Sequence, residues 1–231
     1  MGKQCGGRIG LPHFITVLFL LLPLVCARGQ DQRRLVSPDG QLEFRLFIAQ
    51  PEGSLSRLAY QVIFHGKRVI DTSFLGLNIH DQEPILGENV GLVASRSGNG
   101  TLTAEYMQNG SIGRRITVEA RITNDYVEFR YLIPRTSALE QILIEDEATE
   151  FDVAEPLRTG RFDVPFSIGA VRISEVPSAG FPAMFLARGE GGVLTAHLAG
   201  ATRDPLVAFD GKTPLVCPWR VVAINRTAST P

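Results

Sequence analysis

The chain has 231 residues, and 23 Lys and Arg side chains against 24 Asp and Glu give it a formal charge of −1 at pH 7. A balance this even excludes the basic surface typical of proteins that bind nucleic acid or anionic membranes. With only three cysteines, the chain must be stabilised mainly by its apolar core, and a chain of this length can bury enough of one.

An apolar segment at the N-terminus predicts an export signal. Residues 14–25 are almost continuously apolar, Lys3 and Arg8 precede them, and the small residue Ala27 follows. The run of about 12 residues is shorter than the roughly 20 needed to cross a bilayer, which disfavours a retained anchor. We therefore expect cleavage near Ala27 and a secreted or periplasmic product. That product keeps 21 basic and 24 acidic side chains, a formal charge of about −3.

The cysteines leave a second possibility open at the N-terminus. Residues 23–26 resemble a lipoprotein box, although Val25 is bulkier than the Gly, Ala or Ser usual before the cysteine. Release is favoured over lipid attachment. Cleavage would also remove Cys5 and Cys26, so no intrachain disulfide is expected. Cys217 lies among apolar neighbours, and a structural cysteine is the favoured interpretation.

Beyond the leader the dominant periodicity is two, the period of a strand with one buried face. The alternating runs are at 42–48, 60–64, 116–122 and 127–133. His65-Gly66 and Asn124-Asp125 turn the chain and predict two hairpins. Turn signals recur along the chain and no stretch has helical spacing. We expect a signal peptide at 1–27 and one all-β domain at 28–231, an antiparallel sandwich or barrel.

Several short segments, taken in order, resemble the N-terminal domain of glycoside hydrolase family 97. They are SPDGQL at 37–42, LAY at 58–60, FHGKRVI at 64–70, SFLGL at 73–77, VEFRY at 127–131, IEDEATEF at 144–151, TP at 213–214 and PWRVV at 218–222. Each segment is weak by itself. Their order makes the resemblance specific, and it covers about 37–227.

The resemblance implies a β-supersandwich, similar in fold to galactose mutarotase, which in the family stands before a (β/α)₈ barrel that hydrolyses α-glucosidic or α-galactosidic bonds. The catalytic carboxylates and most calcium ligands of the family belong to the barrel, so no catalytic residue is predicted here. The family's domain itself supplies one calcium-binding glutamate in a His-Glu-Ala stretch. Here Leu198 follows His197 and offers no oxygen to Ca²⁺, so no metal or cofactor is expected. The segment between Arg96 and Gly113 is also shorter than in the family.

Aromatic and hydrogen-bonding side chains give candidate carbohydrate contacts. An exposed indole beside an arginine would stack on a sugar face, although the apolar residues around Trp219 favour core packing for it. Tyr126 and Tyr131 are further aromatics that an exposed sheet face could carry. The candidate carbohydrate-binding residues are Trp219, Arg220, Tyr60, Tyr106 and His197.

Other polar residues have ordinary structural interpretations. His65 and His80 fall in turns, where surface histidines are favoured over a mutarotase acid–base pair. The acidic run at 145–147 lacks the spacing of a calcium loop and predicts a solvated strand end. Asn99, Asn109 and Asn225 begin glycosylation sequons whose use depends on the host.

Three functions are compatible with these observations. The favoured one is an exported, non-catalytic carbohydrate-binding or scaffolding domain. The second is the N-terminal part of a split or truncated α-glucosidase or α-galactosidase, whose barrel partner is a separate chain. The third is an autonomous sugar epimerase or hydrolase, which would require clustered titratable residues that the sequence does not show.

Overall fold

The computed structural model describes residues 2, 30–110, 113–188, 192–200 and 206–226. Apart from residue 2, the predicted signal peptide, with its cysteines and cleavage site, therefore lies outside the described residues. Among the residues that are described, no helix is long and apolar enough to cross a membrane. Their regular elements are β-strands, and all ladders between them are antiparallel, so the all-β prediction is confirmed.

The strands form four sheets. The first, in the order β1-β2-β3-β4, contains β1 (Gln30–Val36), β2 (Leu42–Ala49), β3 (Arg57–Phe64) and β4 (Lys67–Phe74). The large sheet, in the order β14-β15-β20-β10-β9-β8-β7 with β19 beside β10, contains β7 (Val90–Gly98), β8 (Thr101–Gln108), β9 (Arg115–Ile122), β10 (Tyr126–Ile133), β14 (Phe166–Ile168), β15 (Val171–Val176), β19 (Leu215–Val216) and β20 (Trp219–Ile224).

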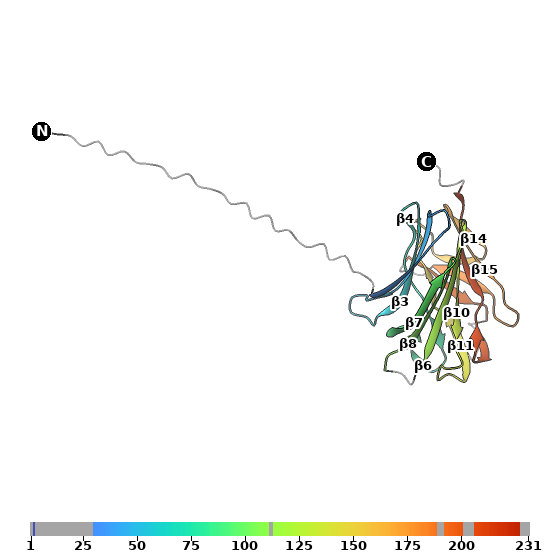
Figure 1. The fold of residues 1–231 in the computed structure, drawn as a ribbon. Helices are drawn as coiled ribbons and strands as arrows, with labels where there is room; N and C mark the ends of the chain where they lie inside the picture. The colour runs from blue at the N-terminus through green and yellow to red at the C-terminus, as the bar shows by residue number, and fades with distance from the viewer. Residues whose placement is uncertain (1, 3–29, 111–112, 189–191, 201–205, 227–231) are drawn as a thin grey trace.

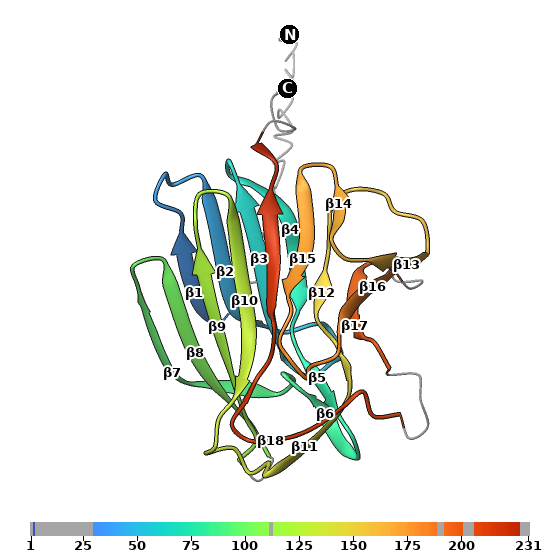
Figure 2. The same ribbon diagram turned by 90° about the vertical axis from the view of Figure 1, so that its right-hand side faces the viewer.

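Two smaller sheets complete the domain and lie beside the large one in Figure 2. The third, in the order β18-β11-β5-β6, contains β5 (Leu77–Ile79), β6 (Gln82–Leu86), β11 (Gln141–Glu147) and β18 (Phe209–Lys212). The fourth, in the order β12-β17-β16-β13, contains β12 (Glu150–Phe151), β13 (Gly160–Asp163), β16 (Met184–Arg188) and β17 (Leu194–Leu198).

Both predicted hairpins are present. The turn between β3 and β4 consists of His65 and Gly66, whose φ angles are 49° and 74°. Positive φ at both positions suits the right-handed twist of the flanking strands. The second hairpin pairs β9 with β10, with Phe129 opposite Ala120. Of the sequons, Asn99 lies exposed in the β7–β8 turn, whereas Ser111 and Thr227 lie outside the described residues.

An aromatic cluster joins the first sheet to the large sheet. Figure 1 shows these two sheets as facing layers. Between them the Phe129 ring of β10 lies 6.0 Å from the Phe44 ring and 4.9 Å from the Tyr60 ring, and Phe151 closes the group. All four side chains are fully buried. The inward positions of the alternating runs therefore form the core of the sandwich.

Two segments of the chain cross closely, Leu75 where the chain enters the third sheet and Gly87 where it leaves that sheet. Gly87 has a φ of 133°, and a Cβ atom there would lie 2.4 Å from the carbonyl oxygen of Leu75. The carbonyl of Gly87 also accepts a hydrogen bond from the backbone N–H of Leu58 at 2.8 Å. Only glycine fits this backbone conformation without displacing a neighbour.

Strand β20 lies inside the large sheet, although it is the last of the described strands in sequence order. It pairs with β10 on one side and β15 on the other, as Figure 2 shows. Just after it, Arg226 donates hydrogen bonds to Asp39 at 2.7 Å and to Gln41 at 2.9 Å. A hydroxyl bond from Ser37 lowers the pKa of Asp39 to about 2, with a smaller contribution from Arg226. The end of β20 is thus held against the β1–β2 turn.

Candidate functional site

In β20 (Trp219–Ile224) the charged arginine faces the core and the tryptophan faces outward, the reverse of what their polarity suggests. Arg220, Val222 and Ile224 point into the core, whereas Trp219 lies half-buried on the outer face of the large sheet. Core packing of Trp219, the interpretation favoured from its neighbours, is therefore wrong. The alternation itself was a usable signal, because Trp219 is three residues from Val222 and so faces the opposite side of the strand.

Arg220 is buried because two carboxylates neutralise it. Its guanidinium is 1 % exposed, contacts both oxygens of Glu147 and donates to Glu175 Oε2 at 2.7 Å. Burial acts to lower the pKa of Arg220, but Glu147 and Glu175 outweigh it and the pKa is raised. Loss of one partner from a buried ion triad of this kind strongly destabilises the folded protein, because it leaves an uncompensated charge in the interior. Arg220 has no surface to offer a saccharide, so the structure makes it a core residue.

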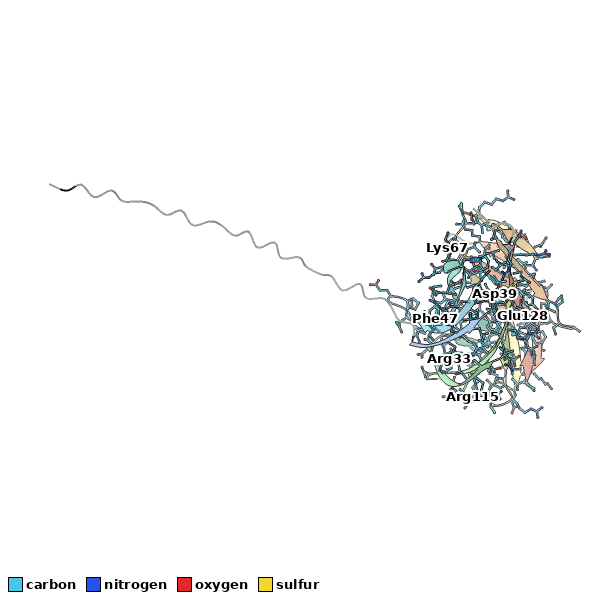
Figure 3. The ribbon with its side chains drawn as sticks, turned by 45° about the horizontal axis from the view of Figure 1, so that its top comes forward. Arg33, Asp39, Phe47, Lys67, Arg115 and Glu128 are labelled. Carbon is cyan, nitrogen blue, oxygen red and sulfur yellow. The ribbon has the colours of Figure 1, made fainter. Side chains whose placement is uncertain are left out.

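The guanidinium groups of two arginines lie over the ring of Trp219, and each arginine is paired with a carboxylate. The guanidinium carbons of Arg121 and Arg130 lie 4.1 and 4.3 Å from the centre of the indole. Arg121 pairs with Glu128 at 2.7 Å, and Arg130 pairs with Glu119 at 2.7 Å. We call these five residues, which come from β9, β10 and β20, the Trp219 platform. Figure 3 shows the side chains of the domain as sticks and labels Glu128, one of these five residues.

Apolar side chains border the platform. Val176 of β15 is the register partner of Trp219, and it is 48 % exposed. Val216 of β19, which is 41 % exposed, pairs with Leu132 of β10. An indole with apolar neighbours and fixed donors and acceptors around it is the combination that stacks on a sugar ring and hydrogen-bonds its hydroxyls.

The tyrosines proposed as sugar contacts do not lie on this face. Tyr60, Tyr106 and Tyr131 are buried in the core. Burial raises the pKa of both Tyr60 and Tyr131. A buried ring has no face to stack on a ligand, so these residues serve packing. Tyr126, at the start of β10, is half-buried.

The acidic run of β11 is not a solvated strand end, since each of its carboxylates has a different partner. A register shift in β11 next to Glu145 interrupts the alternation of its side chains. As a result Glu145 contacts His80 at 2.7 Å, Asp146 contacts His197 at 2.6 Å, and Glu147 turns inward to Arg220. Their partners are 51 to 73 residues away in sequence. The sequence-based prediction failed because pairing over such separations leaves no local pattern.

His197 is a half-buried residue in an ordered setting. Its Nδ1 donates to Asp146 Oδ2, while Asp146 Oδ1 accepts the backbone N–H of Leu198 at 2.7 Å. Its ring stacks on Phe185 of β16 at 5.4 Å, and Arg161 of β13 lies over the same Phe185 ring at 3.7 Å. Leu198, the next residue, is fully buried in the core. His197 lies on β17 and Trp219 on β20, and the two side chains have different partners: Asp146 and Phe185 for His197, and Arg121 and Arg130 for Trp219.

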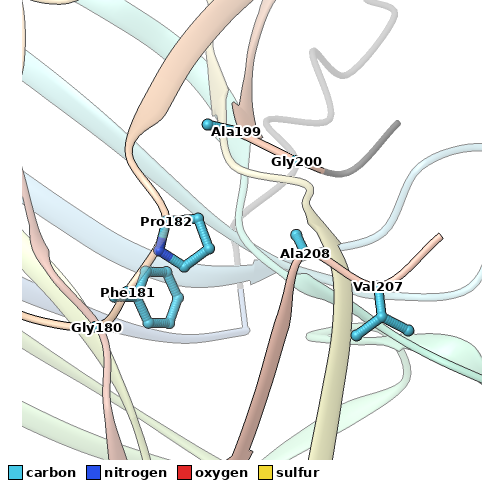
Figure 4. Close-up of a pocket in the computed structure, with 7 residues that line it drawn as sticks. All are labelled: Gly180, Phe181, Pro182, Ala199, Gly200, Val207 and Ala208. Carbon is cyan, nitrogen blue, oxygen red and sulfur yellow. The ribbon is translucent and has the colours of Figure 1, made fainter. Parts of the chain in front are cut away.

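An open hollow of about 340 Å³ lies at the end of the fourth sheet (Figure 4). The side chains that line it are small or apolar, while backbone polar atoms form a large part of its surface, and nearby Leu206 is 57 % exposed. The ring of Phe181 packs on Phe209 of β18 at 4.8 Å at its edge. The residues that line the hollow are Gly180, Phe181, Pro182, Ala199, Gly200, Val207 and Ala208.

Reactive and metal-binding groups are sparse in the described ranges. No group of three or more His, Cys, Asp or Glu side chains there could hold a metal ion. Cys217 is buried, and burial raises the pKa of its thiol to about 12. A thiol in this setting is protonated at neutral pH and is a poor nucleophile.

His80 gives the domain a predicted pH dependence. Its hydrogen bond to Glu145 raises the pKa of His80 above the ordinary value of 6.5. The stability that this pair adds is therefore fully present below pH 6.5 and is lost as the pH rises through the raised pKa. We expect His80→Gln to lower the melting temperature at about pH 5.5 and to have less effect at about pH 8.5. His65→Asn, in an exposed turn, is the control, and an equal effect of His80→Gln at both pH values would contradict the prediction.

Comparisons with known proteins place the fold. No family model matches the sequence, and no curated protein matches it. Among solved structures, a variant of a glycoside hydrolase family 97 enzyme from Pseudoalteromonas sp. strain K8 superposes with a TM-score of 0.67 at 21% identity. The match covers 84% of this chain and 35% of the enzyme. A β-arabinopyranosidase superposes with a TM-score of 0.65 at 18% identity, covering 85% of this chain and 40% of that one.

This chain thus spans between a third and two-fifths of the length of the structures it resembles. The matched part of the family 97 enzymes is their N-terminal region, and the resemblance expected from the short sequence segments is confirmed in three dimensions. The chain has the fold of the N-terminal β-sandwich domain of glycoside hydrolase family 97 enzymes.

Proposed function

We propose that this domain is an exported, non-catalytic module that binds saccharides through the Trp219 platform. The observation that supports the proposal is the half-buried indole on an outer sheet face, bordered by the exposed side chains of Val176 and Val216. Arginine N–H groups and glutamate oxygens beside it can donate to and accept from sugar hydroxyls. The guanidinium and carboxylate charges of the platform balance, which favours a neutral sugar over a charged one.

The sugars bound in structures of the similar enzymes suggest a ligand for testing saccharide binding. Family 97 enzyme structures have been solved in complex with panose and in complex with acarbose. We therefore take panose, a neutral sugar, as the first probe. Trp219 is the only tryptophan of the chain, so a change of intrinsic tryptophan fluorescence during titration reports on the platform and on nothing else.

Trp219→Ala is expected to weaken panose binding, measured by isothermal titration calorimetry, by at least about tenfold, because central aromatic anchors carry most of the binding energy at such sites. Trp219→Phe should retain part of the affinity. Arg172→Gln, an exposed change on β15, is the matched control and should bind as the unmodified domain does. Equal affinity of the Trp219→Ala variant and the unmodified domain would contradict the proposal.

A second function, docking onto a separate glycosidase barrel, is favoured by the hollow at the end of the fourth sheet. The apolar side chains of Phe181, Pro182 and Val207 and the exposed Leu206 would be covered by a partner, and the matched region makes up only 35% of the first relative's chain. In a pull-down with a separately produced family 97 barrel, Val207→Glu should abolish the complex. Val93→Glu, on the exposed part of β7, should leave it intact. Absence of a complex with the unmodified domain would argue against this function.

A further inference from the structure

The two arginines of the Trp219 platform are held with different strength. Arg130 directs two N–H groups, Nε at 2.8 Å and Nη2 at 2.7 Å, to Glu119, and its side chain is 28% exposed. Arg121 reaches Glu128 through Nη2, and its side chain is 50% exposed. Arg121 is therefore the guanidinium that can leave the indole more easily, because it loses fewer contacts and gains solvent.

The carboxylate partners are held differently as well. Glu128 is 9% exposed, and Glu119 is 27% exposed. The acceptor of Arg121 is thus fixed in the sheet, while the guanidinium that it holds is half in solvent. A guanidinium hinged on a fixed carboxylate can turn about that contact without disturbing the sheet.

We propose that Arg121 is a displaceable cover on the Trp219 indole, so that a ligand ring gains the indole face only by moving the Arg121 guanidinium aside. The role assigned to the ligand rests on the proposed function, whereas the cover itself is a property of the free domain. A cation over an indole at an exposed site adds a modest attraction. The cover therefore weakens ligand binding by a factor of about two to five.

The cover also makes the platform selective. A ligand that only stacks must compete with the Arg121 guanidinium. A ligand whose hydroxyls can accept from the displaced N–H groups regains part of what the displacement loses. Arg121 thus favours polyhydroxylated rings over simple aromatic or aliphatic rings at this face. Arg121 is a specificity residue in this scheme, and Trp219 supplies the stacking surface.

The first experiment tests the cover without any ligand. Acrylamide quenching of the single tryptophan should be about twofold stronger in Arg121→Gln than in the unmodified domain, because the quencher reaches a face that the guanidinium had occupied. Arg172→Gln, at an exposed position of β15 that is not one of the five platform residues, is the control and should not change quenching. Melting temperatures confirm that each variant is folded. Unchanged quenching in folded Arg121→Gln would overturn the proposal.

The second experiment titrates panose into the same proteins. Tighter binding by Arg121→Gln, about two- to fivefold, supports the cover. Weaker binding would overturn it, because the contacts of Arg121 with the ligand would then contribute more to binding than displacement of the guanidinium costs. If quenching rises in Arg121→Gln but neither protein binds panose, the cover is supported, and the proposed function fails for this sugar. The two ideas can therefore fail separately.

Discussion

Replacement of Arg220 by methionine is expected to destabilise the domain by about 3–5 kcal/mol, a large part of the total stability of a domain this size. The change removes the cation that neutralises Glu147 and Glu175 but leaves both carboxylates in the interior. Chemical denaturation at about pH 7 measures the loss. Part of it should return at low pH, where the stranded carboxylates become protonated.

A double variant separates the charge effect from packing. Glu147→Gln combined with Arg220→Met removes one stranded charge, and the loss should be smaller than the sum of the two single changes. Arg172→Met, an equivalent change at an exposed position of β15, should alter stability by less than about 0.5 kcal/mol. A loss below about 1 kcal/mol for Arg220→Met alone would show that the triad is not needed for folding.

Gly87→Ala is the second change with a large expected effect, about 3 kcal/mol. The added methyl group would lie 2.4 Å from the Leu75 carbonyl oxygen, and the residue would keep a φ of 133° that L-residues rarely adopt. The backbone must move where the segments that enter and leave the third sheet cross. The shift of the denaturation midpoint measures the effect.

Gly53→Ala is the matched control for Gly87→Ala, because it tests a positive φ without a close contact. Gly53 also has a positive φ, 69°, but an added Cβ there meets no atom within 4 Å. The only cost is that alanine must adopt a positive φ, so the free energy of unfolding should fall by about 1 kcal/mol. Similar losses at Gly53 and Gly87 would show that the close approach to Leu75 is relieved at little cost.

The strands and hairpins could be predicted because their signal is local. Alternation along β2, β9 and β10 marks the buried face of each strand, and residues such as His65-Gly66 mark the turns. The same rule indicates that Tyr60, which alternates with Val62 and Phe64, belongs to the core. The prediction that Tyr60 contacts a sugar considered only the residue type and neglected this alternation.

The orientation of β20 could not be predicted from polarity. An arginine beside a tryptophan suggests that the charge faces water and the indole faces the core. The reverse holds because Glu147 and Glu175, at 73 and 45 residues away, neutralise Arg220 inside the sandwich. Only the folded chain brings these three side chains together. The Trp219 platform was hidden for the same reason, since Arg121 and Arg130 come from other strands.

The position of β20 has a consequence for synthesis of the protein. Strand β20 fills an internal position of the large sheet but is synthesised after the other described strands, and its arginine neutralises carboxylates made long before it. Until then β10 and β15 each present an unpaired edge, and Glu147 lacks its cation. Folding must therefore finish after β20 has been made, and the nascent chain passes through a stage with two exposed strand edges that invite association with other chains.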